Sequence, residues 1–219
     1  MKRRDFVQTS IMGGAYALLS SNPLSSIAGS HSLDDMWLNK SDNKWFNKPM
    51  RWAQLVLVEN DPGSFDPDFW LDYFKKVHAD AACLSAGGIV AYYPTMVPLH
   101  HRSAWLGDSD PFGYLVKGCR DMDMSVIART DPHATWDVVE KKHPDWIQVG
   151  LNGEKRRHWS NPDLWVTCAL GPYNFEFMND VHREIMELYE IDGIFSNRWA
   201  GHGICYCKHC KKNFKDYSG

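Results

Sequence analysis

The sequence predicts an α/β fold of parallel strands joined by helices, because short apolar runs alternate with amphipathic helical patterns along the chain. These runs are followed by polar or glycine residues, which is typical of strands that are buried on both faces. They comprise residues 52–58, 81–85, 125–129 and 192–197. Strands of this kind build either a barrel or an open, doubly wound sheet.

Two observations favour a barrel of the (β/α)8, or TIM-barrel, type. No glycine-rich nucleotide loop follows the first strand, as a doubly wound sheet would require. Polar and aromatic residues instead collect after the carboxyl end of each strand, where barrels build their sites. A whole barrel needs about 250 residues. Residues 51–219 are therefore expected to hold a barrel truncated to about the first four β/α units, its N-terminal half.

The connections between the strands carry recognisable helix signals. Asp66-Pro67 and Asp110-Pro111 each combine a capping aspartate with a proline in the first turn. The expected helices cover residues 66–77, 110–122 and 172–190. Before the last of them, the Asn152-Gly153 turn predicts a hairpin of residues 146–149 and 155–159.

The first residues have the pattern of an export signal. A basic start with Arg3-Arg4 and Phe6 precedes a short apolar run and small residues near Ala28. Paired arginines resemble the twin-arginine signal, so residues 1–28 are expected to direct the protein to the periplasm or the exterior. The alternative is a basic amphipathic start without an export role. Residues 29–50, rich in Ser, Asp and Asn, are expected to be a linker.

Composition narrows the range of partners. The formal net charge of −3 gives no reason to expect nucleic acid. The apolar run of residues 11–19 is far shorter than the roughly 20 residues that span a bilayer, so no membrane anchor is expected after signal removal. The open strand edges of a half barrel would be sticky, and a homo-oligomer is one consequence.

Four cysteines predict a metal site. Cys205, Cys207 and Cys210 form a C-x-C-x2-C pattern, and Cys168 is the natural fourth ligand of a tetrahedral, structural zinc. His202 and His209 are substitutes for it. Disulfides are the alternative, because the protein is expected to be exported.

Several segments together resemble a known group of enzymes. The chain is similar to the first half of family 42 β-galactosidases, and more closely to proteins of the hypothetical glycosyl hydrolase 6 type. The similarity spans roughly residues 50–217, and its motifs are Arg156-Arg157-His158-Trp159, Cys168 to Tyr173, Asp192-Gly193 with Asn197, and Cys205 to Cys210 with Phe214. The resemblance implies a sugar-binding barrel and a structural zinc on Cys168, Cys205, Cys207 and Cys210.

The chain departs from this pattern on its fourth strand. The relatives have an Asn-Glu pair there, in which the glutamate is the general acid/base. Asn197 matches the asparagine, but Arg198 occupies the glutamate position. Arginine stays protonated and cannot donate a proton to a leaving oxygen. Glycoside hydrolysis needs two carboxylates, of which at most one is expected from this half.

The remaining candidates follow the expected strands. Asp131 and His133 are candidates for hydroxyl binding or acid/base work, although Thr-Asp-Pro is also an ordinary turn. The candidate catalytic residues are Asp131, His133 and Asn197, and the candidate substrate-binding residues are Glu59, His101, Arg198 and Trp199. Arg198 has a second interpretation, an ion pair with a core carboxylate such as Asp131.

Three functions fit these observations. The first is an exported glycoside hydrolase that cleaves O-glycosidic bonds in the complete protein. The second is a non-catalytic carbohydrate-binding barrel that lacks the acid/base carboxylate, which Arg198 favours. The third is a nonfunctional truncated product of a larger gene.

Overall fold

The computed structural model describes residues 45–48, 50–199 and 203–219. The chain divides into residues 1–44 and 45–219, and the second unit contains all the described elements. The expected signal at residues 1–28 and most of the expected linker at 29–50 lie outside the described residues. Within the described ranges, no helix is long and apolar enough to cross a membrane.

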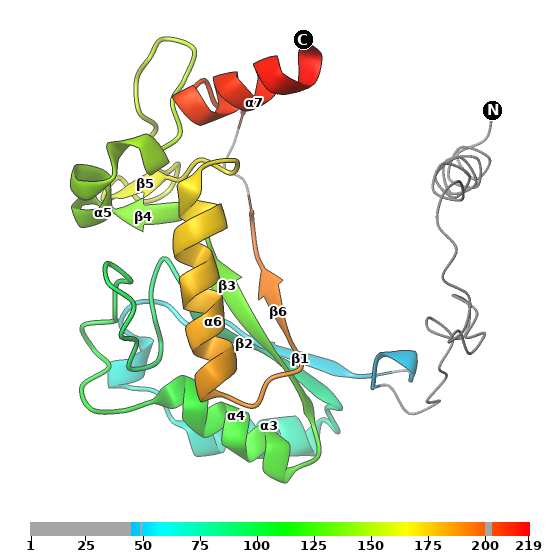
Figure 1. Ribbon diagram of the computed structural model, residues 1–219. Coiled ribbons are helices and arrows are strands. Elements are labelled where there is room, and N and C mark those ends of the chain that lie inside the picture. The colour runs from blue at the N-terminus through cyan, green and yellow to red at the C-terminus, as the bar shows by residue number, and fades with distance from the viewer. Residues whose placement is uncertain (1–44, 49, 200–202) are drawn as a thin grey trace, which may run out of the picture. The chain divides into compact units, whose positions relative to one another are not determined.

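A four-stranded parallel sheet forms the centre of the unit (Figure 1). Its strands lie in the order β1, β2, β3, β6, and each pair is parallel. The strands are β1 (Trp52–Leu55), β2 (Ala81–Gly88), β3 (Ser125–Asp131) and β6 (Gly193–Ser196). The predicted parallel α/β fold is thus confirmed. Between the described residues of β1 and β6 there is no pairing, so the sheet is open and no closed barrel is seen.

Helices α4 and α6 pack on one face of this sheet, and α3 packs against α4. The Asp-Pro signals work as predicted, since Asp66 accepts bonds from two amides of α3 and Asp110 from the Gly113 amide of α4. The third predicted helix begins with a π-helical turn, which apolar spacing cannot distinguish from an α-helical one. The bounds are α3 (Pro67–Lys76), α4 (Pro111–Asp121), η4 (Tyr173–Phe177) and α6 (Met178–Leu188).

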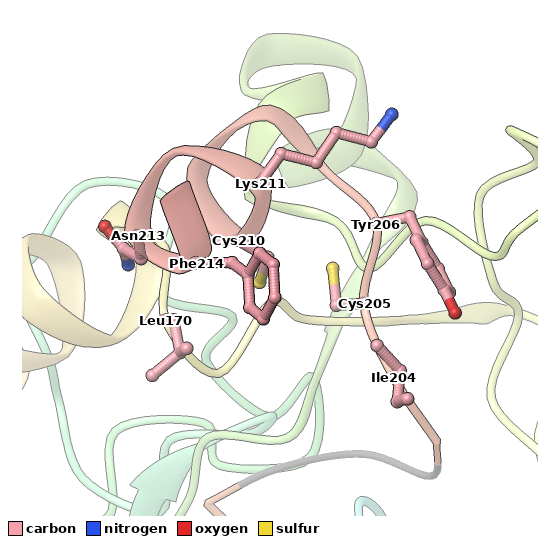
Figure 2. A pocket seen from close by; sticks show the side chains of 8 residues that line it. All are labelled: Leu170, Ile204, Cys205, Tyr206, Cys210, Lys211, Asn213 and Phe214. Atoms are coloured by element: carbon pink, nitrogen blue, oxygen red, sulfur yellow. The ribbon is translucent and has the colours of Figure 1, made fainter. Parts of the chain in front are cut away.

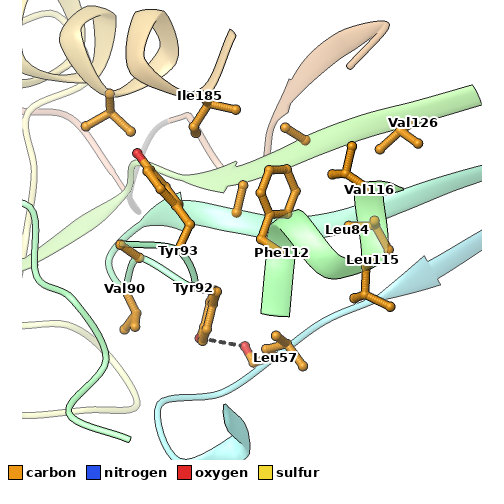
Figure 3. Close-up of a cluster of buried hydrophobic side chains, with 14 of the residues drawn as sticks. Leu57, Leu84, Val90, Tyr92, Tyr93, Phe112, Leu115, Val116, Val126 and Ile185 are labelled. Atoms are coloured by element: carbon orange, nitrogen blue, oxygen red, sulfur yellow. Dashed lines mark hydrogen bonds between the residues drawn. The ribbon is translucent and has the colours of Figure 1, made fainter. Parts of the chain in front are cut away.

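The core lies between the sheet and these helices. Figure 3 shows Leu84 of β2 and Val126 of β3 beside Phe112 of α4, while Ile185 of α6 completes the layer. All four side chains are almost fully buried. Burying side chains of this size contributes about 1.5–3 kcal/mol each, so this face holds much of the stability of the unit.

The opposite face of the sheet is only partly covered. Side chains alternate along β3, so that Val126 lies under the helices whereas Ile127, Arg129 and Asp131 point to the other side. Phe195 pairs with Arg129 in register and is 45% exposed. In a complete barrel this face would line the interior.

A small antiparallel ribbon, β4 (Ala134–Trp136) with β5 (Leu164–Val166), follows the end of β3. The predicted hairpin about Asn152-Gly153 was only partly right, because Val149 and Lys155 form an isolated bridge but Ile147 and Arg157 pair with the segment around β5. The remaining described elements are η1 (Trp45–Asn47), η2 (Asp61–Gly63), α5 (Asp137–Lys142), η3 (Pro144–Trp146) and α7 (Lys208–Ser218).

Candidate functional site

A cavity of about 300 Å³ lies at the carboxyl end of the sheet. Three of the predicted residues line it: Glu59 after β1, Asp131 at the end of β3 and His133 just beyond. Parallel strands place their carboxyl ends at one edge, which is why residues so far apart in sequence meet there. The volume is at the small end of ligand pockets. Apolar side chains make up much of the wall: Leu57, Val58, Ile89, Val90, Tyr92, Trp136 and Leu164.

Asp131 is held by two donors on one oxygen. Its Oδ1 accepts a bond from Arg129 Nη2 at 3.1 Å and from Asn197 Nδ2 at 2.5 Å. Asn197 therefore contacts the site through Asp131. The residue that pairs with Asp131 is Arg129 of the same strand, so the alternative interpretation of Arg198 as its ion-pair partner was wrong.

Glu59 pairs with His101, another predicted residue. His101 Nε2 lies 3.1 and 3.2 Å from the two carboxylate oxygens of Glu59, and the Ala104 amide donates to Oε1. The imidazole of His101 also packs on the indole of Trp136, with ring centroids 4.4 Å apart. Trp136 in turn donates from Nε1 to the Ile89 carbonyl at 2.8 Å, so its ring is fixed at the cavity wall.

His133 is buried and stacks on Trp159, with an angle of 22° between their ring planes. Burial lowers the pKa of His133 to about 4, and the charges of Arg198 and Arg129 act in the same direction. The neutral imidazole therefore prevails at physiological pH. Its Nδ1 has no hydrogen-bond partner in the described part of the chain and lies 3.9 Å from Asp131 Oδ1.

Arg198 and Trp199 are not among the residues that line the cavity. The guanidinium of Arg198 sits 5.3 Å from the centre of the Trp159 ring, and its φ of 52° is the left-handed conformation that few non-glycine residues adopt. Trp199 meets Phe175 edge to face and is 39% exposed.

A buried network anchors the long loop behind the cavity. His100 Nε2 accepts the Gly88 amide at 3.0 Å, so its other nitrogen carries the proton and faces Thr95 Oγ1 at 3.1 Å. Thr95 and Tyr93 donate to the carboxylate of Glu184 on α6. Burial lowers the pKa of His100 to about 4. The network thus connects Gly88, which precedes the lining residue Ile89, to Glu184 on helix α6.

Arg129 and Trp136 were missed by the sequence analysis. Strand alternation offers a signal for Arg129, because residues i and i+2 share a face and Arg129 stands two positions before Asp131. Trp136 lies in a three-residue strand that carries no periodic signal of its own.

The four predicted cysteines converge at a second place. The sulfurs of Cys168, Cys205, Cys207 and Cys210 all lie within 4.8 Å of one another, and Cys168 is 3.4 Å from both Cys207 and Cys210. A tetrahedral zinc with bonds of about 2.3 Å would separate its sulfurs by about 3.8 Å. The thiols are free rather than joined in disulfides. Their arrangement fits a structural metal of the four-cysteine type.

Hydrogen bonds hold the segments that carry these cysteines. The Cys168 amide donates to the Trp146 carbonyl at 2.7 Å, and the Val149 amide approaches Cys205 Sγ at 3.5 Å. The Cys168 thiol donates toward Cys205 and thereby lowers the pKa of Cys205. A lower pKa favours the thiolate, which is the form that metals bind. His209, an alternative candidate for the fourth ligand, lies within hydrogen-bond distance of Asp145 instead. His202, the other alternative, lies outside the described residues.

An apolar hollow of about 550 Å³ adjoins this cluster. Figure 2 shows Leu170, Ile204 and Phe214 of α7 around it, with the sulfurs of Cys205 and Cys210 at its side. Among the described residues, the lining of this larger hollow includes no carboxylate or histidine.

Comparisons with known proteins place the chain among glycosidase-like folds. It is similar to alpha-L-fucosidase isoenzyme 2 from Paenibacillus thiaminolyticus, with a TM-score of 0.62 and 20% identity over 78% of this chain and 26% of that one. The chain thus spans about a quarter of that fucosidase, and identity this low shows a shared fold alone. A hypothetical protein from Ruminiclostridium thermocellum gives a TM-score of 0.49 with 14% identity, covering 77% of this chain and 90% of that one.

A noncanonic maltogenic alpha-amylase from Thermotoga neapolitana gives a TM-score of 0.48 with 15% identity, covering 77% of this chain and 44% of that one. No curated protein matches the sequence. Residues 67–198 match the family model described as hypothetical glycosyl hydrolase 6. This match includes β2, β3 and β6 and covers more than half of the chain. The chain belongs to the hypothetical glycosyl hydrolase 6 family.

Proposed function

We propose that the chain is part of an exported glycoside hydrolase, and that the cavity at the carboxyl end of the sheet is its carbohydrate site. The observation that carries the proposal is the convergence of Glu59, Asp131 and His133 from separate segments on one cavity in a glycosyl hydrolase family member. Carboxylates and imidazoles are the usual partners of sugar hydroxyls, and the fixed indole of Trp136 offers a flat apolar surface to a sugar ring.

Hydrolysis of an O-glycosidic bond needs two carboxylates that flank the bond. Asp131 is our candidate for one of them, with His133 and Asn197 beside it. The second would come from further β/α units. The partly covered face that carries Ile127, Arg129 and Phe195 supports this view, because additional strands would bury it. We therefore propose that residues 51–219 form the N-terminal half of a TIM barrel.

Carbohydrate binding without catalysis is the second candidate. Arg198 occupies the position where the resemblance to family 42 β-galactosidases implies a general acid/base glutamate, and its guanidinium lies by the ring of Trp159, which stacks on His133. Such a barrel would hold a sugar with Glu59, His101, Arg198 and Trp199 but would not cleave it.

Two further parts of the proposal concern the remainder of the protein. The geometry of the four sulfurs supports a structural zinc, which would fix the loop after β6 against the segment around Val149. The Arg3-Arg4 pattern supports export by a twin-arginine signal to the periplasm or beyond.

The test is sugar binding and hydrolysis by the purified chain. A panel of nitrophenyl glycosides, with galactosides and fucosides among them, should change the tryptophan fluorescence, and Asp131→Asn and Glu59→Gln should weaken that response at least tenfold. Asp180→Asn, which removes an exposed carboxylate on α6, is the matched control. Binding without nitrophenol release would favour the second candidate, and the absence of any binding would contradict both.

A further inference from the structure

We infer that Arg129 and Asn197 are positioning residues that fix one oxygen of Asp131 and leave its other oxygen, Oδ2, to accept a hydrogen bond from a sugar hydroxyl. The inference rests on the proposed function, because it assigns separate tasks to residues of the same site. Arg129 and Asn197 are absent from the lining of the cavity, whereas Asp131 is part of it. They would therefore act on a ligand through Asp131.

The two donors come from β3 and from the residue that follows β6. Arg129 Nη2 and Asn197 Nδ2 both bond to Oδ1, at 3.1 and 2.5 Å. Within residues 45–48, 50–199 and 203–219, no protein group bonds to Oδ2. A carboxylate oxygen can accept two hydrogen bonds. Asp131 thus has acceptor capacity that the described residues leave unused, at the wall of a cavity.

The backbone beneath Asp131 is fixed as well. The Ile89 amide donates to the Asp131 carbonyl at 3.0 Å, and the Asn197 amide donates to the Thr130 carbonyl at 2.8 Å. Gly88 has a φ of +106°, and a Cβ there would lie 2.5 Å from the Asp131 amide nitrogen. This close approach of β2 and β3 holds the Asp131 Cα in place, so two bonds to one oxygen define the orientation of the carboxylate.

Arg129 has a further reason to bind Asp131. Its side chain is 12% exposed, and a buried guanidinium needs an anionic partner. Asp131 is its ion-pair partner, and Arg129 Nε has no hydrogen-bond partner among the described residues. The burial of Arg129 therefore favours its ion pair with Asp131.

Glu59, the second carboxylate at the cavity, is held differently. His101 lies close to both of its oxygens, and the Ala104 amide adds a third contact. A ligand hydroxyl would have to share or displace these contacts. Of the two carboxylates, Asp131 is thus the one that the chain prepares for a new hydrogen bond.

The first part of the experiment tests, without any sugar, whether Arg129 helps to orient the carboxylate of Asp131. In two-dimensional ¹H–¹⁵N spectra, the side-chain amide of Asn197 reports its bond to Oδ1, and Asn197→Ser identifies its resonance. Arg129→Met should shift this resonance and speed its hydrogen exchange, whereas Arg129→Lys should leave it near its original place. Arg183→Met, which breaks an exposed ion pair with Asp180, is the matched control. An unchanged Asn197 resonance in folded Arg129→Met would overturn the inference.

The second part measures the affinity for whichever nitrophenyl glycoside the wild type binds. Loss of the charged donor should weaken binding about tenfold in Arg129→Met, and loss of the neutral amide donor about threefold in Asn197→Ser. Arg129→Lys should stay closer to the wild type. Equal affinities in folded variants would contradict the inference. If Arg129→Met fails to fold, Arg129→Lys and Asn197→Ser decide the outcome. A wild type that binds no sugar would refute the proposed function, and the Asn197 resonance would then still decide whether Arg129 positions Asp131.

Discussion

The cavity and the cysteine cluster both join segments that are far apart in the sequence, but they are held together in different ways. Around the cavity, hydrogen bonds within the chain fix Asp131, Glu59 and Trp136 individually. In the cluster, Cys168 meets Cys207 and Cys210 through sulfur contacts of 3.4 Å, which are weak bonds. The comparison predicts that the chain forms the cavity by itself, whereas the cluster needs a metal.

Removal of the metal should have the largest effect. We expect about one zinc per chain by metal analysis, lost in Cys207→Ser, because structural zinc contributes roughly 10–16 kcal/mol in small metal-dependent domains. Helix α7 should then lose protection in hydrogen exchange, since Cys207 caps its first turn. The Asp131 region should keep its protection. Cys83→Ser, a change of a cysteine on the sheet, is the control that should retain the metal. Metal-free protein with an ordered α7 would refute this prediction.

The next effect concerns the close approach of two strands at the cavity. Gly88→Ala should lower the free energy of unfolding by about 2–4 kcal/mol, because its φ is +106° and the new Cβ would meet the Asp131 backbone. Gly107→Ala is the matched control, since Gly107 also has a positive φ but an added Cβ would meet nothing within 4 Å. Gly107→Ala should lower the free energy of unfolding by only about 1 kcal/mol. Urea unfolding measures both, and equal losses would show that the strand contact is unimportant.

These features differ in how far the sequence could predict them. The caps at Asp66 and Asp110 were recognisable because a capping aspartate and a proline act locally. The four cysteines were recognisable because ligand spacing is itself a chemical pattern. By contrast, the bond from Asn197 to Asp131 depends on the register between β3 and β6, which no local pattern encodes.

The short ribbon shows the same limit. Its strands have three residues each, too few for an alternating pattern. The hairpin predicted from the Asn152-Gly153 turn was therefore right at the Val149–Lys155 bridge but wrong for Ile147 and Arg157, which pair with the segment around β5. Trp136 lies on this ribbon, which is why its place at the cavity wall could not be foreseen.

Acid should lower the free energy of unfolding through two buried histidines, His100 in the loop behind the cavity and His133 in the cavity wall. Burial lowers the pKa of His100 and of His133 from 6.5 to about 4, so the unfolded chain binds more protons than the folded one between these values. Their contribution to stability is complete above pH 6.5 and is lost as the pH falls toward 4. For His100 the loss is up to about 3 kcal/mol, because the effect of burial on its pKa outweighs the opposite effect of the nearby Glu184 carboxylate. Chemical unfolding between pH 7 and 4 measures it.

His100→Gln provides the control for this pH dependence, because an amide can accept the Gly88 amide without titrating. The variant should have a flatter stability profile over the same range. A profile as steep as that of the wild type would show that other groups cause the acid sensitivity.

Trp136→Phe should produce the smallest change in stability and still discriminate between the two regions. The substitution keeps an aromatic ring against His101 but removes the indole bond to the Ile89 carbonyl, which costs about 1 kcal/mol. Because the ring is then free to turn, sugar affinity should fall about threefold by fluorescence or calorimetric titration, while zinc content stays unchanged. Phe69→Leu on α3, which removes an exposed aromatic ring that does not line the cavity, is the matched aromatic control. If Trp136→Phe lowers the zinc content, the cavity and the cluster are not independent, and the comparison between them fails.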